Sequence, residues 1–442
     1  MQFFKQIFLT QRFYGLLIAI ILLYLNAFWL PFVLPFAHAA LFVLALLFIL
    51  ELLFLFRSDA LKGERLCADK FSNGDENTVR LVVENQYPAK VRLTLLDELP
   101  QQFQKRNHSF QLALHRAEAQ QITYTLVPKK RGPYHFGQLR VFVSVLARLV
   151  QRRYNLASEK EVAVYPSFVQ MRHYELLAIS NRLVTAGIKK LRKAGHNREF
   201  EQIENYVPGD DYRKINWKAT ARKNQLMVNH YQDERSQNVI LAIDKGRSMK
   251  MPFEGLSLLD YAINSSLVIA NIALRKGDRA GLVSFQNTLN TQVLPANRGS
   301  QLNTLMEQLY RQKTSYKESS FKPVHSWLRY RVSQRSLVVL YTNFESIHAL
   351  RRQLPYLKLI NRNHLLLVVF FKNTEIEALS KEPASTVEAI YTKGLAESLL
   401  MEKQQMAQEL EQQGIQALLT APADLNVNTL NRYLELKNRG MI

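Results

Sequence analysis

The chain has 442 residues, 47% of them hydrophobic, and its formal net charge is +21. This length gives room for two or three domains with membrane anchors, and the hydrophobic content excludes a wholly disordered protein. Cys67 is the one cysteine in the sequence, so an intramolecular disulfide is excluded, which suits a reducing compartment.

Two apolar runs open the sequence and predict a helical hairpin in a membrane. Residues 13–30 carry no charge, and residues 37–56 carry only that of Glu51. Each run approaches the ~20 residues that a helix needs to cross a bilayer. Pro31 and Pro35 separate the runs, which favours two spans over one long helix. A cleaved signal peptide is the alternative, but the first run is long and a second run follows it.

Basic residues flank this hairpin on one side. Lys5 and Arg12 precede the first run, Arg57, Lys62 and Arg65 follow the second, and the connector has no Lys or Arg. The positive-inside rule therefore predicts a multi-pass inner-membrane protein whose soluble domains are cytoplasmic. The net charge of +21 then favours anionic inner-membrane lipid as a partner, with about 1 kcal/mol of attraction for each basic residue near the surface.

Residues 58–170 predict a small antiparallel β-sandwich or barrel. Short alternating runs at 78–83, 90–96, 121–127, 139–146 and 161–165 are separated by turn residues. Residues 130–137 read KRGPYHFG, which indicates a hairpin that positions an edge strand, or alternatively a binding loop. Nothing in this part of the sequence suggests catalysis.

A polar segment, residues 171–236, links this domain to the next. Pro208, Gly209, Asp210 and Asp211 predict a turn, and either aspartate can cap a helix over residues 212–223. Trp217 lies among the charges of that helix, either as an interface anchor or buried in its own domain. An upstream basic cluster is a docking face, a lipid contact or a solvated surface: Lys189, Lys190, Arg192, Lys193 and Arg198.

The same segment carries a resemblance to a known family. Tyr206-Val207-Pro208-Gly209-Asp210-Asp211-Tyr212-Arg213, then Ile215-Asn216-Trp217 and Ala221-Arg222, resemble the signature of the domain of unknown function family numbered 58. Residues 130–137 and 430–436 are similar to further parts of that family. The resemblance implies a membrane-anchored protein with a von Willebrand factor A-like domain. It also implies a working partner among the AAA+ ATPases of the MoxR type.

Residues 237–442 alternate strand-like and helix-like segments. Strands are predicted at 239–243, 280–285, 337–341, 365–371 and 415–419, and helices at 257–275, 300–312, 348–360, 395–413 and 426–436. Apolar strands joined through helices predict a doubly wound α/β domain whose mostly parallel sheet is covered on both faces. This is the architecture that a von Willebrand factor A-like domain has.

The resemblance also implies a cation site, and the sequence departs from it. The family-wide pattern uses Asp-x-Ser-x-Ser on one loop, a Thr on a second and an Asp on a third. Here the first loop has Asp244, Gly246 and Ser248, Ser300 stands in for the Thr, and Asn343 replaces the Asp. With a carboxylate and a hydroxyl missing, we expect Mg²⁺ to bind weakly or not at all. Alternatively, Asp244 and Ser248 only hydrogen-bond their own loop.

The sequence offers no set of catalytic residues. We find no phosphate-binding glycine loop and no zinc motif, and Asp210 and Asp211 beside Arg213 fit a turn better than an acid/base pair. Arg213 and Arg222 are expected to tie the signature segment, with Asn216 and Trp217, to the sheet domain or a partner. We predict a non-enzymatic adaptor in complex maturation or cell-envelope homeostasis, without a small-molecule substrate.

Two alternatives come from other functional classes. A membrane-bound hydrolase would use a distorted metal site at Asp244. A membrane-tethered nucleic-acid binder would use the positive charge, although no nucleic-acid-binding motif supports it.

Overall fold

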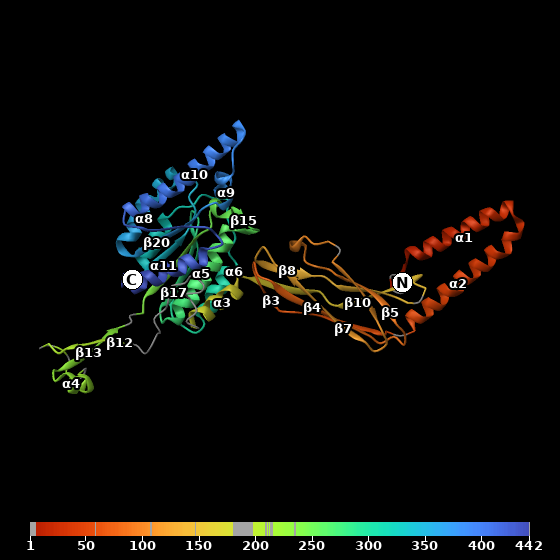
Figure 1. Cartoon of the computed structure of the whole chain (residues 1–442), viewed down its shortest axis with the longest axis horizontal. Coiled ribbons are helices and arrows are strands. Elements are labelled where there is room, and N and C mark those ends of the chain that lie inside the picture. Colours follow the sequence, from red (N-terminus) through yellow and green to blue (C-terminus); the bar gives the residue numbers. More distant parts are fainter. Residues whose placement is uncertain are drawn as a thin grey trace. The chain divides into compact units, whose positions relative to one another are not determined.

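The computed structural model describes residues 6–57, 59–106, 108–145, 147–179, 198–207, 210, 212, 215–233 and 236–441. By its internal contacts the chain divides into two compact units, Met1–Tyr165 and Pro166–Ile442. Figure 1 labels the helices and strands of both units, which are described separately below.

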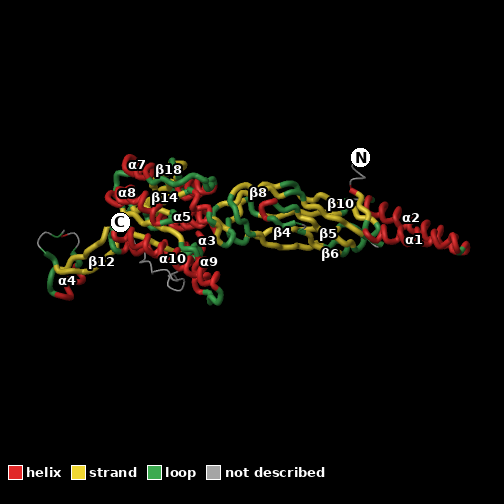
Figure 2. The backbone as a smooth tube through the Cα atoms, turned by 90° about the horizontal axis from the view of Figure 1, so that it is seen from above, coloured by secondary structure: helices red, strands yellow, loops and turns green. Residues whose placement is uncertain are grey.

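Two apolar helices begin the first unit, and the prolines separate them as predicted. Helix α1 (Gln11–Trp29) begins at the Thr10 cap, and α2 (Leu34–Phe56) follows the short 3-10 helix η2 (Pro31–Val33). Both prolines lie in first turns, where a missing N–H removes no helical hydrogen bond. α1 and α2 lie side by side (Figures 1 and 2), and by length and composition both can cross a membrane.

The rest of this unit is built from strands, as predicted. The strands are β1 (Ile7–Leu9), β2 (Leu61–Cys67), β3 (Lys70–Ser72), β4 (Asn77–Asn85), β5 (Val91–Asp97), β6 (Ser109–Leu114), β7 (Ala119–Leu126), β8 (Gly132–Phe136), β9 (Leu139–Ser144), β10 (Val150–Ala157) and β11 (Lys160–Tyr165). They form sheets in the orders β1-β10-β9-β5-β6, β2-β4-β7 and β3-β11-β8. Inward-facing residues alternate with exposed ones along β4 and β5, which makes one face of each sheet apolar.

The segment 130–137 contains an edge strand, β8. β8 lies at the edge of its sheet and pairs antiparallel with β11. Tyr134 and Phe136 point into the core, and the Tyr134 hydroxyl donates to the Lys130 carbonyl at 2.8 Å. The predicted edge strand is confirmed, but the predicted hairpin is wrong, because β8 pairs with β11 and lies in a different sheet from β7 and β9.

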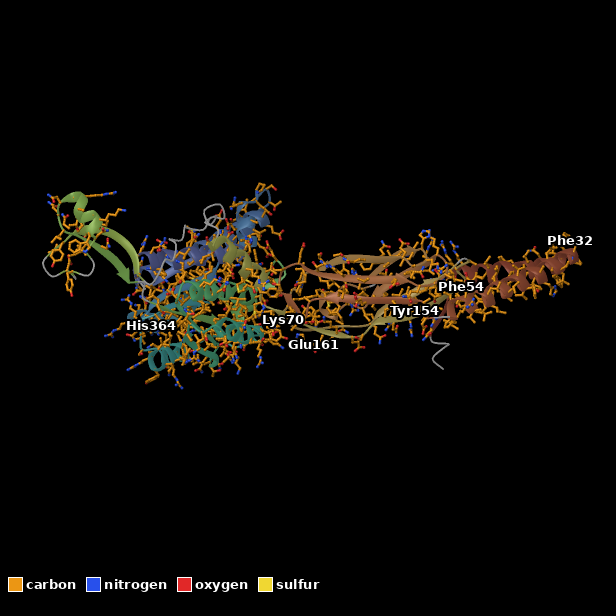
Figure 3. All side chains as sticks on the ribbon, turned by 90° about the horizontal axis from the view of Figure 1, so that it is seen from below. Phe32, Phe54, Lys70, Tyr154, Glu161 and His364 are labelled. Carbon is orange, nitrogen blue, oxygen red and sulfur yellow. The ribbon has the colours of Figure 1, made fainter. Side chains whose placement is uncertain are left out.

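A buried carboxylate joins α2 to the strands. Glu51 is 5% exposed and accepts hydrogen bonds from the backbone N–H groups of Arg148, Leu149 and Val150, at 2.8, 2.8 and 3.1 Å. Three N–H donors on one carboxylate satisfy both the charge and the backbone. Nearby, Tyr154 hydrogen-bonds Tyr87 at 2.6 Å, and Figure 3 labels Tyr154 together with Phe54 of α2 at this end of the strands.

The second unit contains a six-stranded mixed sheet. Its strands are β14 (Asn238–Asp244), β17 (Arg279–Phe285), β18 (Leu289–Ala296), β19 (Leu337–Tyr341), β20 (Leu365–Phe371) and β21 (Gln416–Thr420). Their order is β18-β17-β14-β19-β20-β21, and every pair is parallel except β17 with β18. β18 was not predicted, because its alternating exposed residues look unlike the continuous apolar runs of the central strands.

Helices cover both faces of this sheet. One apolar core joins the sheet to α3 (Phe168–Ile179), α5 (Leu258–Arg275), α6 (Gln301–Tyr310) and α11 (Leu425–Asn438). The other joins it to α7 (Lys322–Arg331), α8 (Ile347–Asn363) and α10 (Val387–Gln412), and α9 (Thr374–Lys381) packs on α10. Along β14, Leu241 enters the first core and Ile240 and Ala242 the second, the two-residue period of a strand buried on both faces.

The signature segment differs from its prediction. β12 (Arg198–Asn205) and β13 (Met227–Asp233) pair antiparallel, and α4 (Trp217–Lys223) lies between them in the chain. The predicted helix over 212–223 is too long. The N-cap of α4 is Asn216, whose side-chain oxygen accepts from the Ala219 N–H at 3.0 Å. Asp210, one of the two predicted caps, instead accepts from the Val207 N–H at 3.0 Å. Some predicted residues lie outside the described ones: Pro208, Gly209, Asp211, Arg213, Lys189, Lys190, Arg192 and Lys193.

Candidate functional site

Asp244 follows five apolar residues at the end of β14. It closes β14, is 1% exposed, and lies at the carboxyl edge of the sheet, where ligands bind in open α/β sheets. Its Oδ1 accepts from the Gly246 N–H at 2.8 Å and from the Ser319 hydroxyl, and its Oδ2 accepts from the Thr342 hydroxyl at 2.7 Å. Burial raises the pKa of this carboxyl, against the opposing effect of these three donors.

Ser319 supplies the hydroxyl that the first loop lacks. A Cβ on Gly246 would come within 1.9 Å of the Ser319 Oγ, so glycine is the residue that leaves room for this serine. Ser300, which was predicted to stand in for the second-loop Thr, does not line the depression around Asp244. It directly precedes α6, where its carbonyl accepts from the Thr304 N–H.

The other predicted residues, Ser248 and Asn343, do line that depression together with Asp244. Asn343 Oδ1 accepts from the Lys403 ammonium of α10 at 3.0 Å, and the same ammonium donates to the Phe344 carbonyl. Burial lowers the pKa of Lys403 to about 8, because a desolvated ammonium is disfavoured. A cation therefore lies beside the position where the family pattern has a carboxylate.

Two ion pairs border the depression. Arg247 pairs with Glu345 at 2.9 Å, and Arg352 pairs with Glu318 at 2.5 Å. All four side chains are largely exposed, so each pair is worth at most about 1 kcal/mol. Their main effect is to neutralise the two glutamates that line the depression.

This donor set does not fit a divalent cation. Asp244 already accepts three hydrogen bonds, and the Glu318 and Glu345 carboxylates are paired with arginines. The Asn343 oxygen is held by an ammonium. Mg²⁺ needs hard oxygen ligands and near-ideal octahedral geometry, usually with one or two free carboxylates. Within the described residues, no group of three or more His, Cys, Asp or Glu side chains is arranged to hold a metal ion.

The signature segment exposes two of its aromatic residues, Tyr212 and Trp217. Trp217 is 70% exposed at the start of α4, so the expectation that it is buried in its own domain is wrong. Tyr212 and Val207 are also exposed, and Arg222 lies exposed in the last turn of α4. The Asn216 side chain holds the helix start and donates to Asn229 Oδ1 of β13 at 2.8 Å, which fixes α4 against the strand.

Sequence reasoning missed Thr342, Ser319 and Lys403. Thr342 directly precedes Asn343 on the predicted third loop, so the sequence carried a signal for it. Ser319 and Lys403 lie far along the chain from Asp244 and Asn343, and only the folded sheet brings them to this edge.

Comparison with known proteins finds a family match that begins in the signature segment. Residues 202–380 match the family described as "Protein of unknown function DUF58". The protein from Bacillus subtilis (strain 168) described as "Uncharacterized protein YeaD" is 26% identical over 180 residues, which are 41% of this chain and 42% of that protein. The chain thus aligns with less than half of that relative's length. Both matches support the resemblance seen in the signature.

Similarities to solved structures are weak. The CARDB domain of the PF1109 protein from Pyrococcus furiosus is 15% identical and covers 24% of this chain and 91% of its own, with a TM-score of 0.17. Proximal thread matrix protein 1 from mussel byssus is 11% identical and covers 46% of this chain and 47% of its own, with a TM-score of 0.28. Both TM-scores are too low to assign a fold.

Proposed function

We propose that this chain is a membrane-anchored, non-catalytic adaptor that binds a partner protein. In this proposal α1 and α2 cross the inner membrane and both soluble parts are cytoplasmic. The sheet of the second unit is a doubly wound, von Willebrand factor A-like domain. Apolar helix composition and the basic flanks of the hairpin support the anchor, and the two-sided helical cover supports the domain type.

The exposure of Trp217 is the observation that carries this proposal. Because Trp217 is largely exposed, its side chain gains little stability from burial, yet it offers a large apolar area to a partner. Lys218, Arg222 and Lys223 on the same short helix add positive charge, and Trp and Arg are the residues most enriched at interface hot spots. These features support α4 as the docking element of the proposal.

The resemblance to the family supplies the partner, an AAA+ ATPase of the MoxR type. We assign the sheet's carboxyl-edge loops around Asp244 as a second part of the docking face. The donor set there supports recognition by hydrogen bonds and charge, without a bound metal or other cofactor. The pair would serve protein complex maturation or cell-envelope homeostasis.

Copurification tests the proposal directly. The tagged chain is extracted from its own membranes in mild detergent, and the copurifying proteins are identified by mass spectrometry. We expect an AAA+ ATPase with the wild type, and at least about tenfold less of it with Trp217→Ala, because a hot-spot tryptophan contributes ~2 kcal/mol or more.

The matched control is Tyr330→Ala, since Tyr330 is 80% exposed on α7, away from the signature. Both variants should unfold at the wild-type temperature. Recovery of the ATPase with Trp217→Ala at wild-type yield would exclude α4 as the docking element. Absence of the ATPase from the wild-type eluate would exclude this partner.

A further inference from the structure

A larger pocket lies beside the Asp244 depression and shares five lining residues with it: Arg247, Ser248, Asn343, Phe344 and Glu345. Its volume is about 370 Å³, within the range of roughly 300–1,000 Å³ typical of ligand sites. The lining is mostly apolar, with Met251, Phe253, Phe344, Phe371, Ile376 and Leu399 among its residues. An apolar group can therefore enter at the carboxyl edge of the sheet.

Lys403 gives this apolar pocket a positive charge. Its ammonium donates to the Asn343 side chain and the Phe344 carbonyl, both of them neutral groups. Within the described residues, no carboxylate lies in ion-pair distance of it. An ammonium has three N–H donors, so one is left for a ligand.

The other charges around the pocket are already engaged or solvated. Arg247 pairs with Glu345, and Lys372 with Glu377, each at 2.9 Å. Glu402 accepts from the Ile347 N–H at 2.9 Å, and Glu375 is exposed in the first turn of α9. Among the lysines and arginines that line the pocket, Lys403 is thus the one that forms no ion pair within the described residues, and the natural complement of its ammonium is a carboxylate.

An exposed apolar row on α10 leads away from the pocket. Val387, Tyr391, Leu395 and Leu399 follow at four-residue spacing on one side of the helix, and we call them the α10 stripe. Val387 is 85% exposed, and Leu399, which also lines the pocket, is 46% exposed. The stripe extends about 18 Å at the helical rise of 1.5 Å per residue. A polypeptide segment matches such a continuous surface, whereas a small molecule would fill only the pocket.

We propose that the pocket and the α10 stripe bind an acidic, apolar peptide segment of a partner protein. An apolar side chain enters the pocket, a neighbouring Asp or Glu carboxylate pairs with Lys403, and the rest of the segment lies along the stripe. The net charge of +21 favours an acidic partner at long range. This inference rests on the proposed function, because it specifies the partner's docking element.

Peptide selection tests the proposal. A display library of random peptides is panned against the full chain in detergent, and selected peptides are measured by fluorescence anisotropy. We expect them to combine an aromatic or branched aliphatic residue with an adjacent Asp or Glu. Lys403→Met and Leu399→Asp should each weaken binding by about tenfold or more, as for loss of one hot-spot contact. Lys403→Arg should keep most of the affinity.

Lys358→Met is the matched control, since Lys358 is exposed on α8 and does not line the pocket. Peptides without acidic residues, binding that Lys403→Met leaves unchanged, or no selected peptides would each overturn the proposal. Displacement of the selected peptides by a free fatty acid, with no effect of Leu395→Asp, would show a small-molecule site instead. Thermal unfolding of each variant checks that it remains folded.

The pH dependence of peptide affinity distinguishes a Lys403 that binds the peptide from one that only supports the fold. Because the pKa of Lys403 is about 8, the wild type should bind the selected peptides more weakly above pH 8, where the ammonium loses its proton. Lys403→Arg should bind equally over this range. The charged groups facing Lys403 are Glu402, Glu345 and Arg247, with Lys372 and Glu375 farther around the lining.

The copurification experiment separates the two proposals. If the ATPase is recovered equally with wild type and Lys403→Met but is lost with Trp217→Ala, the adaptor function holds and the pocket inference fails. If acidic peptides bind through Lys403 while no ATPase copurifies, the pocket inference holds and the proposed partner is wrong.

Discussion

Single residues at the sheet edge combine to hold one buried carboxylate. The Asp244 carboxylate collects the Gly246 N–H and the hydroxyls of Ser319 and Thr342. Asp244→Ala leaves these three donors without their acceptor, which should cost about 3 kcal/mol in the free energy of unfolding. Asp244→Asn keeps the shape and an acceptor oxygen, so it should cost less. Denaturant unfolding in detergent at pH 7 measures both. An alanine variant as stable as wild type would contradict this account.

The pKa of Asp244 also predicts a pH dependence. Since burial raises it above 3.8, the folded chain holds this proton more tightly than the unfolded chain does. The part of the stability that comes from this tighter proton binding is therefore present at low pH and is lost as the pH rises from about 3.8 through the folded-state pKa. The difference in unfolding free energy between wild type and Asp244→Asn should fall over this range. A difference that grows with pH would show that the three donors outweigh burial.

The Ser319 hydroxyl occupies the space that a side chain at position 246 would need. A Cβ at position 246 would clash with the Ser319 hydroxyl. In Gly246→Ala this hydroxyl must therefore turn away from Asp244, and the hydrogen bond between Ser319 and Asp244, worth about 1 kcal/mol, is lost. Ser319→Ala removes the same bond. We expect the double variant to cost about as much as either single one, whereas independent effects would add. A double-mutant cycle of unfolding free energies distinguishes the two outcomes.

At the level of elements, hydrogen bonds to Glu51 connect α2 to the start of β10 and the two residues before it. Glu51→Leu leaves three backbone N–H groups unpaired, which should cost about 3 kcal/mol or more. Glu51→Gln keeps one acceptor oxygen, so its stability should lie between those of the wild type and Glu51→Leu. Thermal unfolding in detergent and protease cleavage between β9 and β10 report the loss. Leu53→Ala is the control, since Leu53 is exposed on the same helix. Equal stability of Glu51→Leu and this control would mean that the contact contributes nothing.

At the level of the whole molecule, the proposed topology can be measured with single cysteines. In a Cys67→Ser background, a cysteine at Phe32, exposed between α1 and α2, should react with a membrane-impermeant maleimide added to intact spheroplasts. A cysteine at Asn438, the last residue of α11, should react only after the membrane is broken. The reverse pattern would place the soluble parts outside, and labelling of both in intact spheroplasts would exclude a membrane-crossing hairpin.

The sequence by itself determined the elements whose signals are local. Continuous apolar runs gave β14, β19 and β20 nearly residue for residue, and Ser257 began α5 with the expected amphipathic pattern. The apolar hairpin and its prolines predicted α1 and α2. Of the candidate site, the sequence identified Asp244, Ser248 and Asn343, because each lies on a loop directly after a recognisable strand.

Only the tertiary structure decided which distant residues complete that site. Ser319 and Lys403 reach Asp244 and Asn343 because the strand order brings the chain back to one edge of the sheet. The exposure of Trp217 could likewise not be predicted from the local sequence pattern, because burial depends on what packs against a residue in the folded chain. Hydrophobic periodicity predicts the secondary structure of a single segment. A site depends on contacts between segments, which exist only once the sheet has formed.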